Sequence, residues 1–438
     1  MNNDKSSFFS KVNNLRSVLF MDRHHKIHQQ AFGFAMLTTL LVVSLIIGGA
    51  TAFKSNADLL GTKAVYTTNF STSKTDNKGT VEGVYRNSAG NRAMVLMKFT
   101  DPGKMSADPA NYRVFATGAK PSGPDEKLKN GDNLKASLVS FGSTGYMGVV
   151  LESAEGFAPQ ITNLTFRSLS EISETKDVKL NPEEGYGKSF SKFDQWRVYA
   201  NFGAKDAKVT KALDDKEINA SDMFYELVIK PEEDEARAQL NKTLSDMSAD
   251  LNAIKEYRER LEGSKINDLT LKMPEDPEEI RGDAIECLDE GASDNGGGDC
   301  KQRKLVTGYI VNGGYHFNWQ ESNVQKGYLK RVVPDGESYI TFLNERASLV
   351  VPNLNIDAVQ WVLSDDSLLS TYDAESLPPV KTMNENITLL TTAWETYYKD
   401  KTAYERDQVE ALLRLEVMYK DVAENATVND SGGVLSVY

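Results

Sequence analysis

The chain has 438 residues, a net charge of −13 at pH 7 and two cysteines. Proteins that bind duplex nucleic acid displace counterions with clustered Lys and Arg. The acidic balance, together with the lack of a basic stripe after residue 53, therefore excludes nucleic acid as an expected partner. The length suggests two or three domains with enough sequence to bury a packed core.

A run without ionisable side chains, Ala31–Phe53, follows a short basic arm at residues 1–30. As a helix it would extend about 35 Å, against a bilayer hydrocarbon core of about 30 Å. Because Lys and Arg outnumber acids in the arm, the pattern predicts a single-pass signal anchor in the cell membrane, with a cytoplasmic N-terminus and residues 54–438 outside the cytoplasm. The lipid bilayer would then be one partner, contacted through residues 31–53. The alternative is a cleaved signal peptide and a secreted protein, since Ala50-Thr51-Ala52 has the small-x-small pattern of a cleavage site.

Residues 54–231 are expected to form an all-β, sandwich-like domain. About nine short β-rich segments are separated by turn sequences such as Asp101-Pro-Gly103 and Gly142-Ser-Thr-Gly145. Segments at this spacing are typical of an antiparallel sandwich or barrel. Their alternation of apolar and polar residues is partial, as in strands that are buried on both faces. A mixed α+β domain is the alternative.

At Pro231 the period of the apolar residues changes from about 2 to about 3.6, which predicts a long amphipathic helix over residues 232–263. Pro231 fits a helix start, and the acids of Glu232-Glu-Asp-Glu235 favour the positive end of the helix dipole. Arg258 fills the one missing place in a 4-3-4-3 seam, which is typical of a coiled coil. The apolar members of this helix-pairing seam are Leu240, Leu244, Met247, Leu251, Ile254 and Leu261.

A second long helix is predicted over residues 383–424. Its apolar stripe passes through Trp394 and Tyr404, and the polar sequence Lys399-Asp-Lys-Thr402 is expected to kink or divide it. The two helices would pair antiparallel, each covering the stripe of the other. The alternatives are packing of each helix on its neighbouring domain and an oligomeric coiled coil. A protein partner or self-association through the helices is therefore expected, and residues 425–438 are expected to form a flexible tail.

Residues 264–382, between the two helices, are expected to form a small α+β module. Its first part has many acids and contains both cysteines, Cys287 and Cys300, which are expected to form a disulfide bond in an oxidising compartment. Two free thiols are the alternative. Farther on, Asn312-Gly-Gly314 between two β-rich segments predicts a hairpin.

Patterns for catalysis, cofactors and metals are weak in this sequence. The one histidine after residue 53, His316, lies in an aromatic strand, and the acidic loop lacks the ligand ladder of an EF-hand. Neither a zinc-type Cys/His set nor a phosphate-binding glycine loop is present. We therefore expect no catalytic, cofactor-binding or metal-binding residues. The candidate binding aromatics, for a sugar or a protein partner, are Tyr315, Phe317, Trp319 and Tyr328, with core packing as the alternative reading.

This layout of a basic arm, one span, a β-domain and long helices resembles envelope-anchored accessory proteins of bacterial secretion, conjugation or cell-surface systems. The resemblance is one of layout, and no motif assigns a named family. It implies a membrane-anchored, extracytoplasmic, non-catalytic scaffold or binding protein. Periplasmic adaptor proteins of efflux and type I secretion share part of the layout, but their helices are joined by a tight turn. A carboxylate-dependent enzyme that acts on cell wall or glycans is the alternative, because that chemistry needs only two acids.

Overall fold

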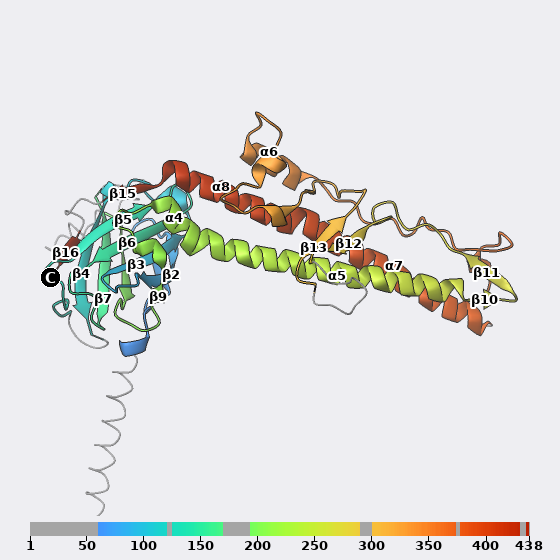
Figure 1. The fold of residues 1–438 in the computed structure, drawn as a ribbon, viewed down its shortest axis with the longest axis horizontal. Helices are drawn as coiled ribbons and strands as arrows, with labels where there is room; N and C mark the ends of the chain where they lie inside the picture. Colours follow the sequence, from blue (N-terminus) through green and yellow to red (C-terminus); the bar gives the residue numbers. More distant parts are fainter. Residues whose placement is uncertain are drawn as a thin grey trace, which may run out of the picture.

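The computed structural model describes residues 60–120, 125–169, 193–289, 300–373, 377–429 and 435–437. A β-rich head lies at one end of the molecule, and a long helical arm extends from it (Figure 1). The chain leaves the head through one helix that runs to the far end of the arm, and it returns to the head through a second helix. The segment between these helices lies along the arm.

The head is built on a seven-stranded sheet. Its strands run in the order β1-β2-β3-β6-β5-β15, and β9 pairs with the end of β2. The bounds are β1 Asn69–Ser71, β2 Lys78–Arg86, β3 Arg92–Phe99, β5 Lys135–Ser140, β6 Tyr146–Glu152, β9 Lys208–Val209 and β15 Thr427–Asn429. The pairing of β2 with β3 shifts between Val81 and Gly83, which leaves Glu82 as the extra residue of a β-bulge.

A second sheet, of four strands in the order β16-β4-β7-β8, packs on one face of the first. The bounds are β4 Tyr112–Ala119, β7 Ile161–Ser168, β8 Gln195–Ala200 and β16 Leu435–Val437. The core between the sheets is apolar, with Val95 and Val149 from the first sheet beside Leu164 from the second. Trp196 stacks on Phe166 in this core, with 5.0 Å between the ring centroids.

The opposite face of the seven-stranded sheet is covered by the start of the arm. Helix α4 (Ala220–Phe224) continues through a π-helix, η4 (Tyr225–Ile229), into α5 (Lys230–Glu262). The ring of Phe224 lies 5.2 Å from that of Phe141 and 5.4 Å from that of Tyr146. The head thus has three layers, and its middle sheet is buried on both faces. The prediction of an all-β sandwich followed by separate coiled-coil-like helices is therefore wrong, because sheets and helices share one core.

The returning helix consists of α7 (Pro378–Thr402), a π-helix, η8 (Ala403–Gln408), and α8 (Val409–Asn425). Pro378 and Pro379 occupy the first turn, where backbone N–H groups have no partner within the helix, so their absence costs no hydrogen bond. Helix α5 packs along both α7 and α8. At the head, the Asp421 carboxylate accepts hydrogen bonds from the backbone N–H of Ser143, at 2.7 Å, and from its hydroxyl, at 2.9 Å.

The segment between the long helices contains short elements. Strands β10 (Lys265–Ile266), β11 (Leu269–Lys272) and β14 (Val362–Leu363) form one small sheet, and β12 (Ala284–Cys287) pairs with β13 (Arg303–Val306). Its one α-helix in the described ranges is α6 (Tyr339–Ser348). Its buried side chains belong to the same core as those of α5, α7 and α8. The 3-10 helices among the described residues are η1 Pro102–Lys104, η2 Pro109–Asn111, η3 Lys211–Leu213, η5 Trp319–Glu321, η6 Leu329–Arg331 and η7 Leu369–Thr371.

Within the described ranges, none of the helices combines the length and the apolar character that crossing a membrane requires. Helix α5 is long enough, but it has charged side chains from its first turn to its last. The predictions of a single-pass membrane protein, a signal anchor and a cell-membrane localisation are contradicted by this finding and are not retained. The predicted span at residues 31–53, the basic arm at 1–30 and the cleavage motif at Ala52 lie outside the described residues.

Candidate functional site

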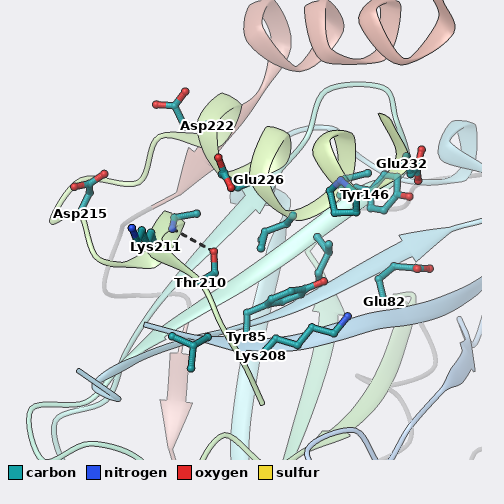
Figure 2. A pocket seen from close by; sticks show the side chains of 16 residues that line it. Glu82, Tyr85, Tyr146, Lys208, Thr210, Lys211, Asp215, Asp222, Glu226 and Glu232 are labelled. Atoms are coloured by element: carbon teal, nitrogen blue, oxygen red, sulfur yellow. Dashed lines mark hydrogen bonds between the residues drawn. The ribbon is translucent and has the colours of Figure 1, made fainter. Parts of the chain in front are cut away.

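A pocket of about 750 Å³ lies at the junction of head and arm. The sheet provides one wall with Tyr85 from β2, Leu96 from β3 and Tyr146 from β6, and the helical segment around η4 lies opposite (Figure 2). The segment from Lys208 to Ala212 closes one side. Residues from both the head and the arm therefore form this pocket.

The β-bulge of β2 brings a carboxylate to the pocket. Glu82 is the extra residue of the bulge, and it lines the pocket together with Tyr85, three positions farther along. Gly83 permits this arrangement, because a Cβ atom there would lie only 2.8 Å from the Tyr85 ring. Bulges often re-aim side chains next to functional sites. The local sequence Glu-Gly-Val-Tyr thus places an acid and an aromatic ring beside the same space.

A second carboxylate comes from the first turn of α5. Glu232 lies against the Tyr146 hydroxyl, and burial, followed by the nearby charge of Glu82, raises the pKa of this carboxyl, while Lys98 lowers it. Burial also raises the pKa of Tyr146, and the charges of Glu232 and Glu82 add to that effect. The two glutamates are therefore close enough to influence each other electrostatically across the pocket.

Acids outnumber bases around the pocket. Its lining includes five carboxylates and two lysines: Glu82, Asp215, Asp222, Glu226, Glu232, Lys208 and Lys211. Asp215 and Asp222 lie on the outer side, away from the two tyrosines (Figure 2). The Lys208 ammonium lies 5.6 Å from the centroid of the Tyr85 ring, and the Lys98 ammonium lies 4.9 Å from that of Tyr146. This set of groups favours the binding of positive charge.

The seam residues of α5 face the inside of the arm. Leu240, Leu244, Met247, Ile254 and Leu261 are buried, and Leu251 is partly buried against the same core. Arg258, at the missing place of the seam, forms an ion pair of 2.7 Å with Asp276. The seam is therefore covered within the chain by α7, α8 and the intervening segment.

The four candidate aromatics also lie in the arm core. Tyr315, Trp319 and Tyr328 are buried, and Phe317 is partly buried with its ring 5.9 Å from that of Tyr328. The Trp319 indole N–H donates a hydrogen bond of 3.0 Å to the Tyr404 hydroxyl. In this structure these rings pack against the long helices and do not form an exposed platform.

Cys287 and Cys300 form a disulfide bond at the loop end of the β12–β13 hairpin. Their sulfur atoms and Asp289 are the one potential metal-ligand group found in the described residues, but both sulfurs are already bonded to each other. His316 is exposed, and partial desolvation lowers the pKa of its imidazole, with a further contribution from Lys304 and Lys401. These residues lie on the arm and do not line the junction pocket.

Buried charged groups hold the intervening segment to the helices. The Lys401 ammonium is 2.7 Å from the Asp283 carboxylate, and both side chains are fully buried. The same ammonium donates to the Glu279 carbonyl at 2.7 Å and to the Thr307 hydroxyl at 2.8 Å, so its three N–H groups are all used. The Tyr397 hydroxyl donates to Asp283 at 2.9 Å.

Three buried glutamates accept backbone N–H groups of the same segment. Glu405 accepts from Val311 at 2.8 Å, Glu233 accepts from Val324 at 3.1 Å, and Glu416 accepts from Leu329 at 2.7 Å and from Tyr328. Buried amides need acceptors, and a carboxylate makes a stronger bond than a neutral oxygen. Glutamates of the long helices thus accept the backbone N–H groups that a neighbouring strand would accept in a sheet.

The sequence did not point to the pocket residues, because three segments more than 60 residues apart contribute Glu82, Tyr146 and Glu232. One local signal was available. A glycine inside a β-rich segment, here Gly83, often indicates a bulge or a close approach. It would have singled out the Glu82–Tyr85 stretch, but neither the pocket nor Glu232.

No protein-family model, curated protein or solved structure matches this chain. The function is therefore argued from the geometry and chemistry of the molecule.

Proposed function

We propose that the protein is a non-catalytic binding protein in which head and arm form one rigid scaffold that holds a partner at the junction pocket. The observation that supports this most directly is the shared hydrophobic core of the sheet and the long helices, on which both walls of the pocket rest. The assignment to a bacterial secretion or conjugation system stays a prediction.

The start of the outgoing helix and the end of the returning helix are both fixed to the head. Phe224 anchors the outgoing helix on Phe141 and Tyr146, and Asp421 anchors the returning helix on Ser143. Tyr225 and Tyr419 join the two helices, with ring centroids 5.9 Å apart. A pocket with preformed walls loses little conformational entropy when a ligand binds, which favours a recognition site.

Site-specific photo-crosslinking tests this proposal. A photoreactive residue replaces Val209, which is 58% exposed at the pocket, or, as a control, Ile340, which is 59% exposed in α6. We expect a discrete adduct from position 209 in the source cells, and its partner, once identified and purified, should bind the full chain. Loss of that binding in the double variant Glu82→Gln/Glu232→Gln is the expected result. Absence of adducts at position 209, or binding that survives in the variant, argues against the pocket as the site.

Self-association through the helices stays a second prediction for the partner. Because the seam of α5 is buried within the chain, a dimer would have to use outer faces of the arm. Sedimentation velocity over a hundredfold concentration range distinguishes a monomer from such a dimer.

A carboxylate-dependent enzyme is the second candidate function, and one observation favours it. Glu82 and Glu232 line the same pocket, and the raised pKa of Glu232 is a property of general acids in glycoside hydrolysis. Release of reducing sugars from cell-wall or glycan polymers by the wild-type chain, and its loss in Glu232→Gln, would replace the binding proposal. No turnover in either protein removes this candidate.

A further inference from the structure

We propose that the junction pocket binds an aliphatic cationic side chain of a partner peptide, a lysine ammonium or an arginine guanidinium, between Glu82, Glu232 and the Tyr85 hydroxyl. This inference rests on the proposed binding function and adds the chemistry of the ligand. Four observations on the described residues support it.

The first is the unused hydroxyl of Tyr85. This side chain is 7% exposed, and within the described part of the chain its hydroxyl makes no hydrogen bond. The hydroxyl points into the space between Glu82 and Tyr146 (Figure 2). The hydroxyl is free to accept a hydrogen bond from an N–H donor that enters the pocket.

The second observation is the arrangement of charge. Glu82 and Glu232 lie beside Tyr85 and Tyr146, and acids exceed bases among the lining residues. Burial raises the pKa of Glu232, Lys98 lowers it, and the charge of Glu82 raises it. A cation placed between the two carboxylates would relieve this repulsion.

The third observation is that the chain already places ammonium groups on these rings. Lys98 lies over Tyr146 and Lys208 lies over Tyr85, at 4.9 and 5.6 Å from the ring centroids. These distances are within the range of cation–π attraction. The two tyrosines therefore have the environment that holds a lysine side chain, and Lys208 competes with an incoming cation for the Tyr85 face.

The fourth observation is size. A volume of about 750 Å³ is that of a pocket for a drug-sized ligand. It admits a long flexible side chain together with neighbouring peptide atoms. Anions are disfavoured by the carboxylates, and a neutral sugar would leave their charges uncompensated.

The test is a calorimetric titration of the purified full chain with defined probes. The probes are acetylated pentalysine amide, acetylated pentaarginine amide, 1,5-diaminopentane, acetylated pentaglutamate amide and a neutral cell-wall oligosaccharide. We expect the lysine and arginine peptides to bind, and we expect their affinity to fall as salt is raised. Binding of the glutamate peptide or the neutral oligosaccharide in their place would overturn the proposal. If the diamine binds as tightly as the peptides, a peptide partner is overturned and a free amine takes its place.

Four variants locate the binding site. Glu82→Gln/Glu232→Gln should weaken peptide binding by about tenfold or more, and Tyr85→Phe by roughly fivefold, because each loses charge or one hydrogen bond to the ligand. Glu385→Gln removes the same kind of charge from an exposed position of α7 and should leave the affinity within about twofold. Equal weakening by Glu385→Gln would mean unspecific attraction to an acidic protein.

The fourth variant, Lys208→Ala, gives the sharpest contrast. It frees the face of Tyr85 and removes a competing positive charge, so a cationic ligand should bind more tightly by roughly two- to fivefold. Weaker binding of the lysine and arginine peptides would mean that Lys208 assists their binding, and it would overturn the proposal. If crosslinks from position 209 persist while none of these variants changes peptide affinity, the binding function stands and the cation inference fails. If the crosslinks are absent, the binding function itself fails.

Discussion

The head core and the arm core are built on different chemistry. Between the two sheets of the head, buried side chains such as Val95, Leu164 and Phe166 are apolar. In the arm, the fully buried residues include Lys401 and Glu405, and Glu416 is only 2% exposed. The head also buries two charged side chains, Arg92 at 8% and Asp194 at 5% exposure, but among the described residues the charged side chains at 0% exposure lie in the arm.

The difference follows from where the backbone hydrogen bonds are made. Strands of the head satisfy one another's N–H and C=O groups, so their side chains are free to be apolar. The segment along the arm has short strands and turns, so its buried amides need other acceptors. Glu233, Glu405 and Glu416 supply these. In the arm, buried carboxylates therefore accept part of the irregular backbone, and each of these carboxylates becomes a sensitive position.

The largest effect is expected from breaking the ion pair in the arm. Lys401→Met leaves Asp283 as an uncompensated buried charge, which should destabilise the protein by about 3–5 kcal/mol in urea unfolding. The matched control, Lys242→Met, breaks an exposed pair with Asp246 and should leave the stability nearly unchanged, because solvent screens this pair. The double variant Lys401→Met/Asp283→Leu should recover most of the loss. A cost below about 1 kcal/mol for Lys401→Met would contradict the contrast between the two cores.

A pH effect of the arm should come from Glu405. Burial raises the pKa of this carboxyl from 4.5 to about 7, while the Val311 N–H and Lys401 lower it and Asp283 raises it. The folded state therefore binds more protons than the unfolded state between these values, so stability falls as the pH rises through that window. The loss is on the order of 3 kcal/mol.

Unfolding of wild type and Glu405→Gln at pH 4.5 and pH 8 tests this. The neutral variant should lack this part of the pH dependence, so that the wild type loses more stability at pH 8 than the variant does. An equal change in the free energy of unfolding between pH 4.5 and pH 8 for the two proteins would show that Glu405 does not titrate in this range.

A smaller loss is expected where a carboxylate accepts backbone amides. Glu416→Leu leaves the N–H groups of Tyr328 and Leu329 without their acceptor, which should cost about 2 kcal/mol. Hydrogen exchange at these two amides should accelerate, while the amides of β3 and β6 should not change. Glu424→Leu, at an exposed position of the same helix, is the control. Uniform acceleration across head and arm would indicate global unfolding and would weaken the local explanation.

The smallest effect concerns packing in the head. Gly83→Ala places a Cβ atom against the Tyr85 ring, so the ring must shift. This shift should lower the free energy of unfolding by about 1 kcal/mol. Gly61→Ala has no atom within 4 Å of its new Cβ and should be neutral in thermal unfolding. Equal melting temperatures for the two variants would show that the bulge is loose.

The periodicity of apolar residues predicted the secondary-structure elements that depend on residues close in sequence. The change of period at Pro231 predicted a helix over residues 232–263, and α5 spans Lys230–Glu262. Partial alternation in Val81–Arg86 and Tyr112–Thr117 predicted strands that are buried on both faces. In β2 the three consecutive residues Gly83–Tyr85 are buried, whereas the start of β4 alternates. These features depend on residues within about one turn or one strand of each other, so a sequence pattern can record them.

Features that depend on distant partners were not predicted. Lys401 reads as part of a polar interruption, but Asp283, 118 positions earlier, makes it a core residue. The hairpin expected around Asn312-Gly-Gly314 has its turn, with Gly313 at φ +77°, but no strand pair follows. Glu405 takes the amides of Val311 and Tyr315, through its carboxylate and its carbonyl, which such a hairpin would need.

The π-helix η8 sets the rotational phase of the returning helix. An α-helix turns about 100° per residue, so one residue more or fewer in a helix rotates all later side chains by that angle. Deleting one residue from Ala403–Gln408 would turn Leu412 and Val422 away from the core they now fill. Before η8 the returning helix packs on α5, and after η8 it packs on α4 at the head as well as on α5. The length of the Ala403–Gln408 turn is thus a constraint on insertions and deletions that no single side chain reveals.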